Sequence, residues 1–141
     1  MASDTTHDLR DLTLLTGVNV DTRRRLLNSS NTEIFPPDTV IISEGDRLDY
    51  LHFILDGVVV LSAGTSENRA VISLLNAGDC FILSAVVKDA VALMSARSLG
   101  QVEIVHVPAG LFRRSLKRDA KLLHNVSVGL GGGFRNMVRD L

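Results

Sequence analysis

The side chains with the most chemical interest lie in one segment, residues 78–98, with the sequence GDCFILSAVVKDAVALMSARS. Residues 80–87 carry no charge, and the first arginine of the segment is Arg97. A buried phosphate without a positive partner is strongly penalised, because its solvation is lost and nothing replaces it. The composition of this segment therefore favours an apolar site over an anion site.

The candidate ligand pocket in this segment combines apolar side chains with two hydroxyls and one guanidinium. Its members are Phe81, Ile82, Leu83, Ser84, Leu93, Met94, Ser95 and Arg97. Ser95 and Arg97 lie two residues apart in an expected strand and so share one of its faces. Ligand pockets are usually apolar with a few polar groups. Three interpretations stay open: a pocket filled by its own side chains, an apolar or planar ligand, or an unknown small metabolite.

Histidine and cysteine are the other side chains that could bind a ligand. His52 and His106 are expected in the middle of strands, His7 in a polar tail, and His124 beside Leu123 in a helix. A histidine in a strand is more often a hydrogen-bonded or exposed residue than a ligand. Cys80 is interpreted as a small buried hydrophobe, with a redox-sensing thiol or haem ligand as the alternative. No histidine pairs with a carboxylate at metal-ligand spacing, so neither a metal site nor an enzyme is predicted.

The composition sets limits on the class of protein. The chain has 141 residues, enough for one compact domain, with 45% hydrophobic and 22% charged residues and a formal net charge of −1. This charge argues against nucleic-acid binding by this piece alone. A single cysteine excludes an internal disulfide. The polar start is not a signal peptide, and no apolar run approaches the roughly 18 residues of a membrane span. We therefore expect a cytoplasmic protein without membrane contact.

Short β-rich runs fill the middle of the chain. They cover residues 39–43, 50–55, 58–63, 70–75 and 102–107, with turn residues between them. Strands at this spacing, rich in Val, Ile and Leu, predict a β-sandwich or barrel. Gly45, Gly57 and Gly78 each lie between two runs, where a tight turn often needs a positive φ. We expect a structural role for these three glycines.

Helical spacing precedes and follows the β-rich region. Residues 9–15 and 21–27 predict two short helices, the second capped by Asp21. After Pro108, apolar residues recur with a heptad period over residues 110–141, which predicts a long helix with a dimer seam. The seam consists of Leu116, Ala120, Leu123, Ser127, Leu130, Phe134 and Met137. The alternative is a helix packed on its own β domain, and residues 129–133 are open between helix and hinge.

This order of elements resembles the sensor half of the Crp/Fnr family of bacterial transcription regulators. The resemblance rests on the turn Glu44-Gly45-Asp46, the glycine Gly57 between two strands, and the turn Gly78-Asp79. It implies a mainly β fold with flanking helices, a cyclic-nucleotide-binding-type β-roll (a double-stranded β-helix or jelly roll), followed by a long dimerisation helix. Residues 1–109 would form the sensor domain and residues 110–141 the dimerisation helix. The family's C-terminal helix-turn-helix domain is missing from this chain, which we interpret as a sensor half, with a natural short form as the alternative.

The resemblance also implies a role in transcription regulation. Family members that bind cyclic nucleotides have a Gly-Glu pair that aligns here with Ile82-Leu83, and an arginine that aligns with Ala92 or Met94. Without these charges, cAMP binding in the usual mode is not expected. We expect a ligand-sensing homodimer with an unknown effector, which contacts DNA only through the missing domain. Alternatives are a haem- or redox-sensing domain, since some members bind haem, and a ligand-free dimerisation module. A cupin-type enzyme is disfavoured because the chain has no His-x-His pair.

Overall fold

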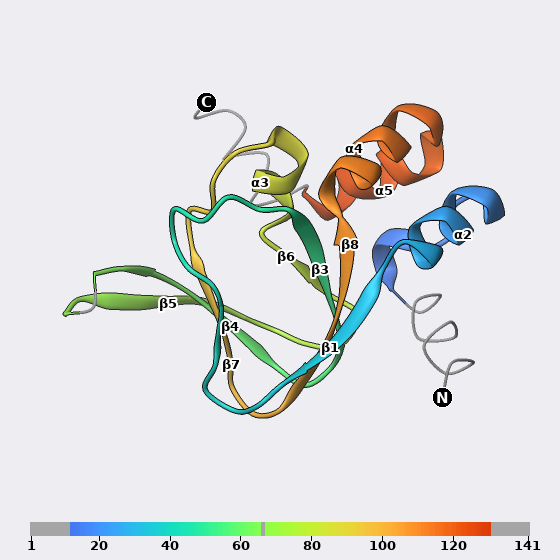
Figure 1. Cartoon of the computed structure of the whole chain (residues 1–141). Helices are drawn as coiled ribbons and strands as arrows, with labels where there is room; N and C mark the ends of the chain where they lie inside the picture. The colour runs from blue at the N-terminus through green and yellow to red at the C-terminus, as the bar shows by residue number, and fades with distance from the viewer. Residues whose placement is uncertain (1–11, 66, 131–141) are drawn as a thin grey trace.

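The computed structural model describes residues 12–65 and 67–130, which form two antiparallel sheets and a layer of helices (Figure 1). One sheet has the strand order β1-β8-β3-β6 and the other has the order β2-β7-β4-β5. The strands are β1 (Asn31–Phe35), β2 (Val40–Ile42), β3 (Tyr50–Asp56), β4 (Val59–Gly64), β5 (Arg69–Leu75), β6 (Cys80–Phe81), β7 (Ser95–Ser98) and β8 (Val102–Pro108). The helices are η1 (Thr13–Leu15), α2 (Val20–Asn28), α3 (Leu83–Lys88), α4 (Ala109–Arg118) and α5 (Ala120–Gly129). Among these helices, none is long and apolar enough to span a bilayer.

The mainly β roll with flanking helices is the fold that the sequence predicted. The five expected strands correspond to β2, β3, β4, β5 and β8, with ends that agree within one residue. Two of the three predicted turn glycines, Gly45 and Gly78, have φ of +88° and +95°. The third, Gly57, has φ +99°, and a Cβ at this position would lie 2.6 Å from the carbonyl oxygen of Gln101. Only glycine fits this turn, because both the backbone angle and the space exclude a side chain.

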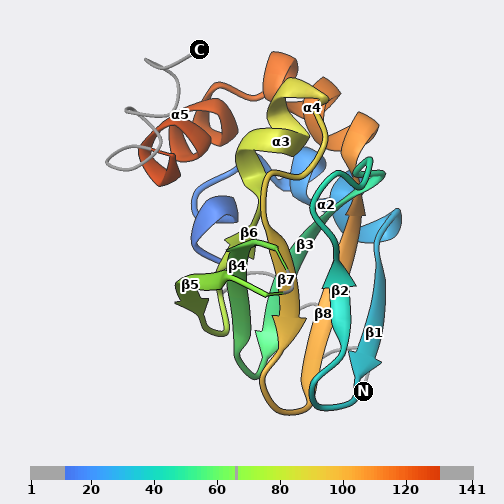
Figure 2. The same cartoon turned by 90° about the vertical axis from the view of Figure 1, so that its left-hand side faces the viewer.

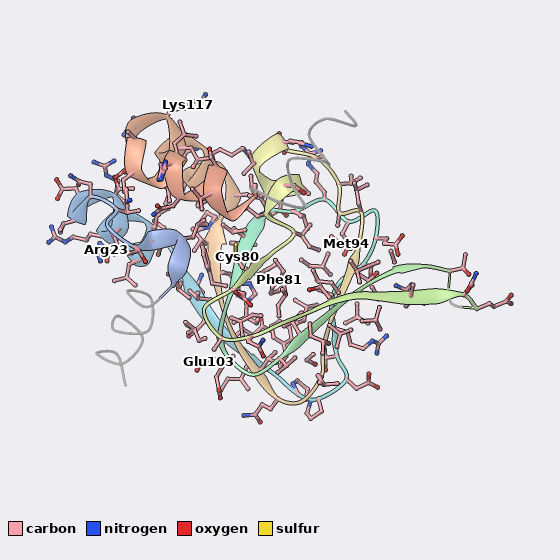
Figure 3. All side chains as sticks on the ribbon, turned by 180° about the vertical axis from the view of Figure 1, so that it is seen from behind. Arg23, Cys80, Phe81, Met94, Glu103 and Lys117 are labelled. Carbon is pink, nitrogen blue, oxygen red and sulfur yellow. The ribbon has the colours of Figure 1, made fainter. Side chains whose placement is uncertain are left out.

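The β1-β8-β3-β6 sheet has one face toward the helices and one face toward the other sheet (Figures 1 and 2). Cross-strand partners in an antiparallel pair share a face. Cys80 is the partner of Phe53 and lines a cavity with α5, so both lie on the helix side. Phe81 is the partner of His52 and therefore lies on the inner face, between the sheets. Figure 3 shows Cys80 nearer the helices and Phe81 nearer the opposite sheet.

The second short helix and the C-terminal segment differ from the sequence-based prediction. The second short helix begins at Val20, and its N-cap is Asn19 rather than Asp21; the Asn19 side chain accepts a hydrogen bond from the backbone N–H of Asp21. The C-terminal segment is divided at Asp119, whose φ of −125° and ψ of 105° are extended rather than helical. The expected single helix is therefore two helices, α4 and α5, over the described residues.

This division separates the members of the predicted seam. Leu116 ends up on α4 and is buried, and Leu130, the C-cap of α5, is also buried within the chain. Ala120, Leu123 and Ser127 remain exposed on α5, with Leu123 49% exposed. Phe134 and Met137 lie outside the described residues, as do residues 131–133. Gly129 is the last residue of α5 and is helical.

Candidate functional site

The segment at 78–98, called the cassette below, folds as strand, short helix and strand. β6 leads through Ile82 into α3, and Asp89 ends that helix before β7. Ile82 has φ 58° and ψ 35°, and Asp89 has φ 55° and ψ 46°. A left-handed conformation is costly for a β-branched residue, because Cβ crowds the following carbonyl. Ile82 is nevertheless held there, with its side chain buried in the core.

The predicted pocket residues do not form one pocket. Phe81, Ile82 and Leu83 are buried in the main hydrophobic core, together with Val86 of α3. Ser84 and Met94 are half-buried, and Met94 packs against that core from its edge. Leu93 points outward and is 65% exposed. Phe81, Ile82 and Leu83 therefore belong to the packed core, whereas Leu93 does not.

Ser95 and Arg97 lie elsewhere, in a cavity of about 230 Å³ on the β2-β7-β4-β5 sheet, whose lining also includes Arg69, Glu44 and Ser62. Each arginine already has a carboxylate partner. Arg97 Nη1 lies 2.9 Å from Asp38 Oδ1, and Arg69 Nη1 lies 3.5 Å from Glu44 Oε1. Ser95 and Arg97 do share a face, but both arginines of their cavity are already paired, and the cavity is separate from the apolar cassette residues.

A second cavity, of about 350 Å³, lies between the start of the cassette and α5. Cys80 and Leu83 line it from the cassette, and Lys121, His124 and Asn125 line it from α5. Burial, with a smaller contribution from the charge of Asp79, raises the pKa of the Cys80 thiol to about 12. The thiolate is the reactive form of cysteine, so this environment opposes both redox reactivity and metal binding by Cys80.

A histidine pair lies on the inner face of the β1-β8-β3-β6 sheet. His52 on β3 is the direct cross-strand partner of His106 on β8, and their Nδ1 atoms are 2.7 Å apart. His106 Nε2 lies 3.0 Å from Oε1 of Glu33 on β1. His52 also stacks on Phe81, with ring centroids 5.2 Å apart and planes at 23°. Burial and then the neighbouring His106 lower the pKa of His52 to about 3, so its imidazole is neutral.

Sequence reasoning treated these two histidines as isolated residues. They are 54 positions apart, and only the register of β3 against β8 brings them together. The alternating pattern of each strand could have placed both on a common face, but it could not have fixed their pairing. Within residues 12–65 and 67–130, no three His, Cys, Asp or Glu side chains gather in a way that could hold a metal ion.

Comparison with known proteins identifies the family of this fold. A model of the cyclic nucleotide-binding domain matches residues 32–119. The chain belongs to the cyclic nucleotide-binding domain family. A search of curated protein sequences gives no match.

Solved structures with the cyclic nucleotide-binding domain fold resemble the whole chain. The sensor domain of the transcriptional regulator DNR from Pseudomonas aeruginosa has a TM-score of 0.83 at 13% identity, covering 99% of this chain and 95% of that one. The catabolite activator protein of Thermus thermophilus has a TM-score of 0.70 at 18% identity. The match covers 91% of this chain and 59% of that chain. The regulatory subunit of a cAMP-independent protein kinase A from Trypanosoma brucei has a TM-score of 0.80 at 16% identity. The match covers 99% of this chain and 51% of that chain. The chain spans 50–63% of three further matched chains. At these identities the likeness concerns the fold.

In the family resemblance, Ile82 and Leu83 align with a Gly-Glu pair, and Ala92 or Met94 aligns with an arginine. Two hydrogen bonds fix the backbone of Ala92: its carbonyl accepts from the Gly45 N–H (2.8 Å), and its N–H donates to the Asp46 carbonyl (2.9 Å). Its side chain is a buried methyl group, and Leu83 is buried in the core. The left-handed backbone at Ile82 is the conformation that favours glycine, the residue with which Ile82 aligns in family members that bind cyclic nucleotides.

Proposed function

We propose that this chain is the ligand-sensing and dimerisation domain of a cytoplasmic Crp/Fnr-like transcription regulator, without enzymatic activity, and that it does not bind cAMP in the usual mode. The observation that carries the second part is that Leu83 and Ala92 are buried apolar side chains, and that Met94, the alternative to Ala92, is also apolar and half-buried. Arg97 does not take their place, because it lies on the other sheet and pairs with Asp38 at 2.9 Å. DNA contact belongs to a helix-turn-helix domain outside this chain.

The kinase regulatory subunit from Trypanosoma brucei supports this proposal. That protein is described as cAMP-independent, and a form of it with three substitutions is bound to cAMP in its A site. In a protein of this fold, cAMP independence and a cAMP-bound form are thus separated by three substitutions. We infer that a small number of cassette residues decides whether this domain binds cAMP.

Calorimetric titration with cAMP tests the proposal. The unchanged chain should release no binding heat, whereas the double variant Leu83→Glu, Ala92→Arg supplies the carboxylate and the guanidinium that the nucleotide requires. Leu83→Glu with Leu93→Arg is the matched control, because Leu93 is exposed and its arginine would point into solvent. Circular dichroism checks that each variant is folded. Tight binding of cAMP by the unchanged chain would refute the proposal.

The dimer half of the proposal rests on the exposed stripe Ala120, Leu123 and Ser127 of α5, whose spacing of three and four residues places them on one helix face. Leu123→Asp places like charges against each other in a symmetric dimer. Analytical ultracentrifugation should then show a monomer. Val128→Asp is the control, because Val128 is also exposed on α5 but lies off the stripe. A Leu123→Asp dimer would exclude this seam.

A haem-sensing domain is the second candidate, favoured by one observation: Cys80 and His124 line the same cavity of about 350 Å³. The imidazole of His124 suits iron, whereas the raised pKa of Cys80 opposes thiolate ligation. Bound haem would supply gas or redox chemistry. Titration with haem should give a Soret shift that His124→Ala abolishes and His52→Phe preserves. Absence of a shift would remove this candidate.

A further inference from the structure

The histidine pair between the sheets has a hydrogen-bond geometry that fixes where protons can lie. A hydrogen bond between two nitrogen atoms needs one donor and one acceptor. At 2.7 Å the Nδ1 atoms of His52 and His106 therefore hold one proton between them. Two protons would place two donors against each other, and none would leave two lone pairs in contact.

Glu33 decides how His106 is oriented in this arrangement. Its carboxylate accepts only, so the nearby His106 Nε2, at 3.0 Å, carries a proton. In neutral His106 the Nδ1 atom is then an acceptor, and His52 must donate from its own Nδ1. In cationic His106 both nitrogen atoms are protonated, so Nδ1 donates and His52 Nδ1 accepts. Neutral His52 must then carry its proton on Nε2.

We propose that His52 and His106 act as a one-proton relay in which protonation of His106 switches the tautomer of His52 and thereby reaches Phe81 of the cassette. The N–H bond at His52 Nδ1 breaks as one forms at His106 Nδ1, and a solvent proton forms a new N–H bond at His52 Nε2. The pair gains one proton and one positive charge, which resides on His106 beside Glu33. The charge on buried His52 never changes.

The surroundings of the pair match a single charge at the Glu33 side. Glu33 is more than half exposed and Tyr50 is partly exposed, with its ring centroid 5.9 Å from that of His106. Toward the other sheet, the inward residues Leu61 and Ala96 carry no charge. His52 is buried between the sheets, and burial together with the neighbouring His106 lowers the pKa of His52 to about 3. The first proton is therefore held at His106.

The cassette is the element placed to respond. Phe81 stacks on the His52 ring and is followed directly by the left-handed Ile82 that begins α3. When His52 switches, its Nε2 changes from an acceptor to a donor on the ring that lies against Phe81. A regulatory role of the relay in ligand sensing rests on the proposed function. The proton transfer itself can be observed without any ligand.

Long-range ¹H–¹⁵N correlation spectra of the 141-residue chain, from pH 4.5 to 8.5, test the relay. We expect His52 to carry its proton on Nδ1 at high pH and on Nε2 at low pH, while His106 becomes cationic. The amide signals of Phe81 and Ile82 should shift with the same midpoint. The proposal is overturned if the tautomer of His52 stays fixed while His106 titrates, or if the two amides do not follow.

Two variants sharpen this test. Glu33→Gln removes the carboxylate beside the His106 cation, so the pH at which the pair has taken up half of its proton should fall. Glu103→Gln is the matched control. Glu103 and its cross-strand partner Ile34 lie on the face of the sheet opposite to His106. An equal shift in both variants would contradict the assigned role of Glu33. A monomeric unchanged chain, or binding of cAMP by that chain, would refute the proposed function and leave these spectra unchanged.

Discussion

The backbone N–H of Asn19 donates to Oδ2 of Asp119 over 3.1 Å, although the two residues are 100 positions apart. The other oxygen of Asp119, Oδ1, accepts from the backbone N–H of Leu122 over 2.9 Å and so caps α5. One carboxylate thus begins α5 and anchors the start of α2 to the corner between α4 and α5. Although burial opposes its charge, bonds from Leu122, Thr22, Asn19 and Lys121 lower the pKa of Asp119.

We expect Asp119→Ala to lower the free energy of unfolding by about 2 kcal/mol at pH 7, because loss of an N-cap removes about 1 kcal/mol and the Asn19 N–H loses its partner. Urea denaturation measures this value. Since the native pKa is depressed, the stabilisation is present above the unfolded pKa of about 3.8 and fades as pH falls through the native pKa. Asp21→Ala is the control, because the Asp21 side chain forms an exposed ion pair with Arg24, and the substitution keeps the backbone N–H that donates to Asn19.

His52 should make the stability of the domain depend on acid. Its pKa falls from 6.5 in the unfolded chain to about 3 in the folded chain, so the unfolded state binds more protons between these values. Stability is then full above pH 6.5 and decreases as pH falls. At pH 5, proton uptake by His52 in the unfolded chain should lower the free energy of unfolding by about 2 kcal/mol relative to pH 7. Urea denaturation of the chain and of His52→Phe at both pH values measures it, and parallel changes in the two proteins would contradict it.

Cys80 should be inert in the folded chain. A pKa raised from 9.0 to about 12 lowers the thiolate fraction roughly a thousandfold at pH 8. Reaction with a disulfide reagent should therefore be slow in buffer and fast in urea, and the chain has no second cysteine to obscure the signal. Equal rates in the two conditions would restore Cys80 as a candidate redox sensor.

The left-handed backbone at Ile82 should reverse the usual ranking of alanine and glycine. Both Ile82→Ala and Ile82→Gly lose a buried side chain. Only alanine keeps the steric conflict at φ 58°, which is worth about 1–2 kcal/mol. Thermal denaturation should show the glycine variant to be the more stable by about 1 kcal/mol. A more stable alanine variant would mean that the cassette has changed its backbone.

The five strands with clear turn signals could be predicted because hydrophobic runs and glycines determine them locally. The helix α3 could not, since LSAVVK is short and its valines favour strands as much as helices. Asp119 also left no visible signal, because a polar residue is ordinary in a helix that repeats apolar residues every seven positions. Its effect comes from Asn19 and Thr22, which contact it only in the folded chain.

The site was harder to predict than the fold for a related reason. Phe81, Ile82 and Leu83 have the apolar character of a pocket lining, but the same character suits a core, and only packing separates the two. Arg97 lies on the same strand face as Ser95. Its guanidinium already donates to the carboxylate of Asp38, which is 59 positions away in the sequence. The partner of each residue comes from a distant part of the chain.

The division of the C-terminal segment into α4 and α5 affects how strongly two copies of the chain can associate. With Leu116 and Leu130 buried in their own protomer, the members of the predicted seam that stay exposed on the described part of α5 are Ala120, Leu123 and Ser127. Specific, stable interfaces bury about 1,200 Å² or more in total, which three side chains cannot provide. Association through this stripe alone would be weak, so the protein concentration would set the fraction of dimer. A ligand that binds the dimer more tightly than the monomer would then show a higher apparent affinity as the protein concentration rises.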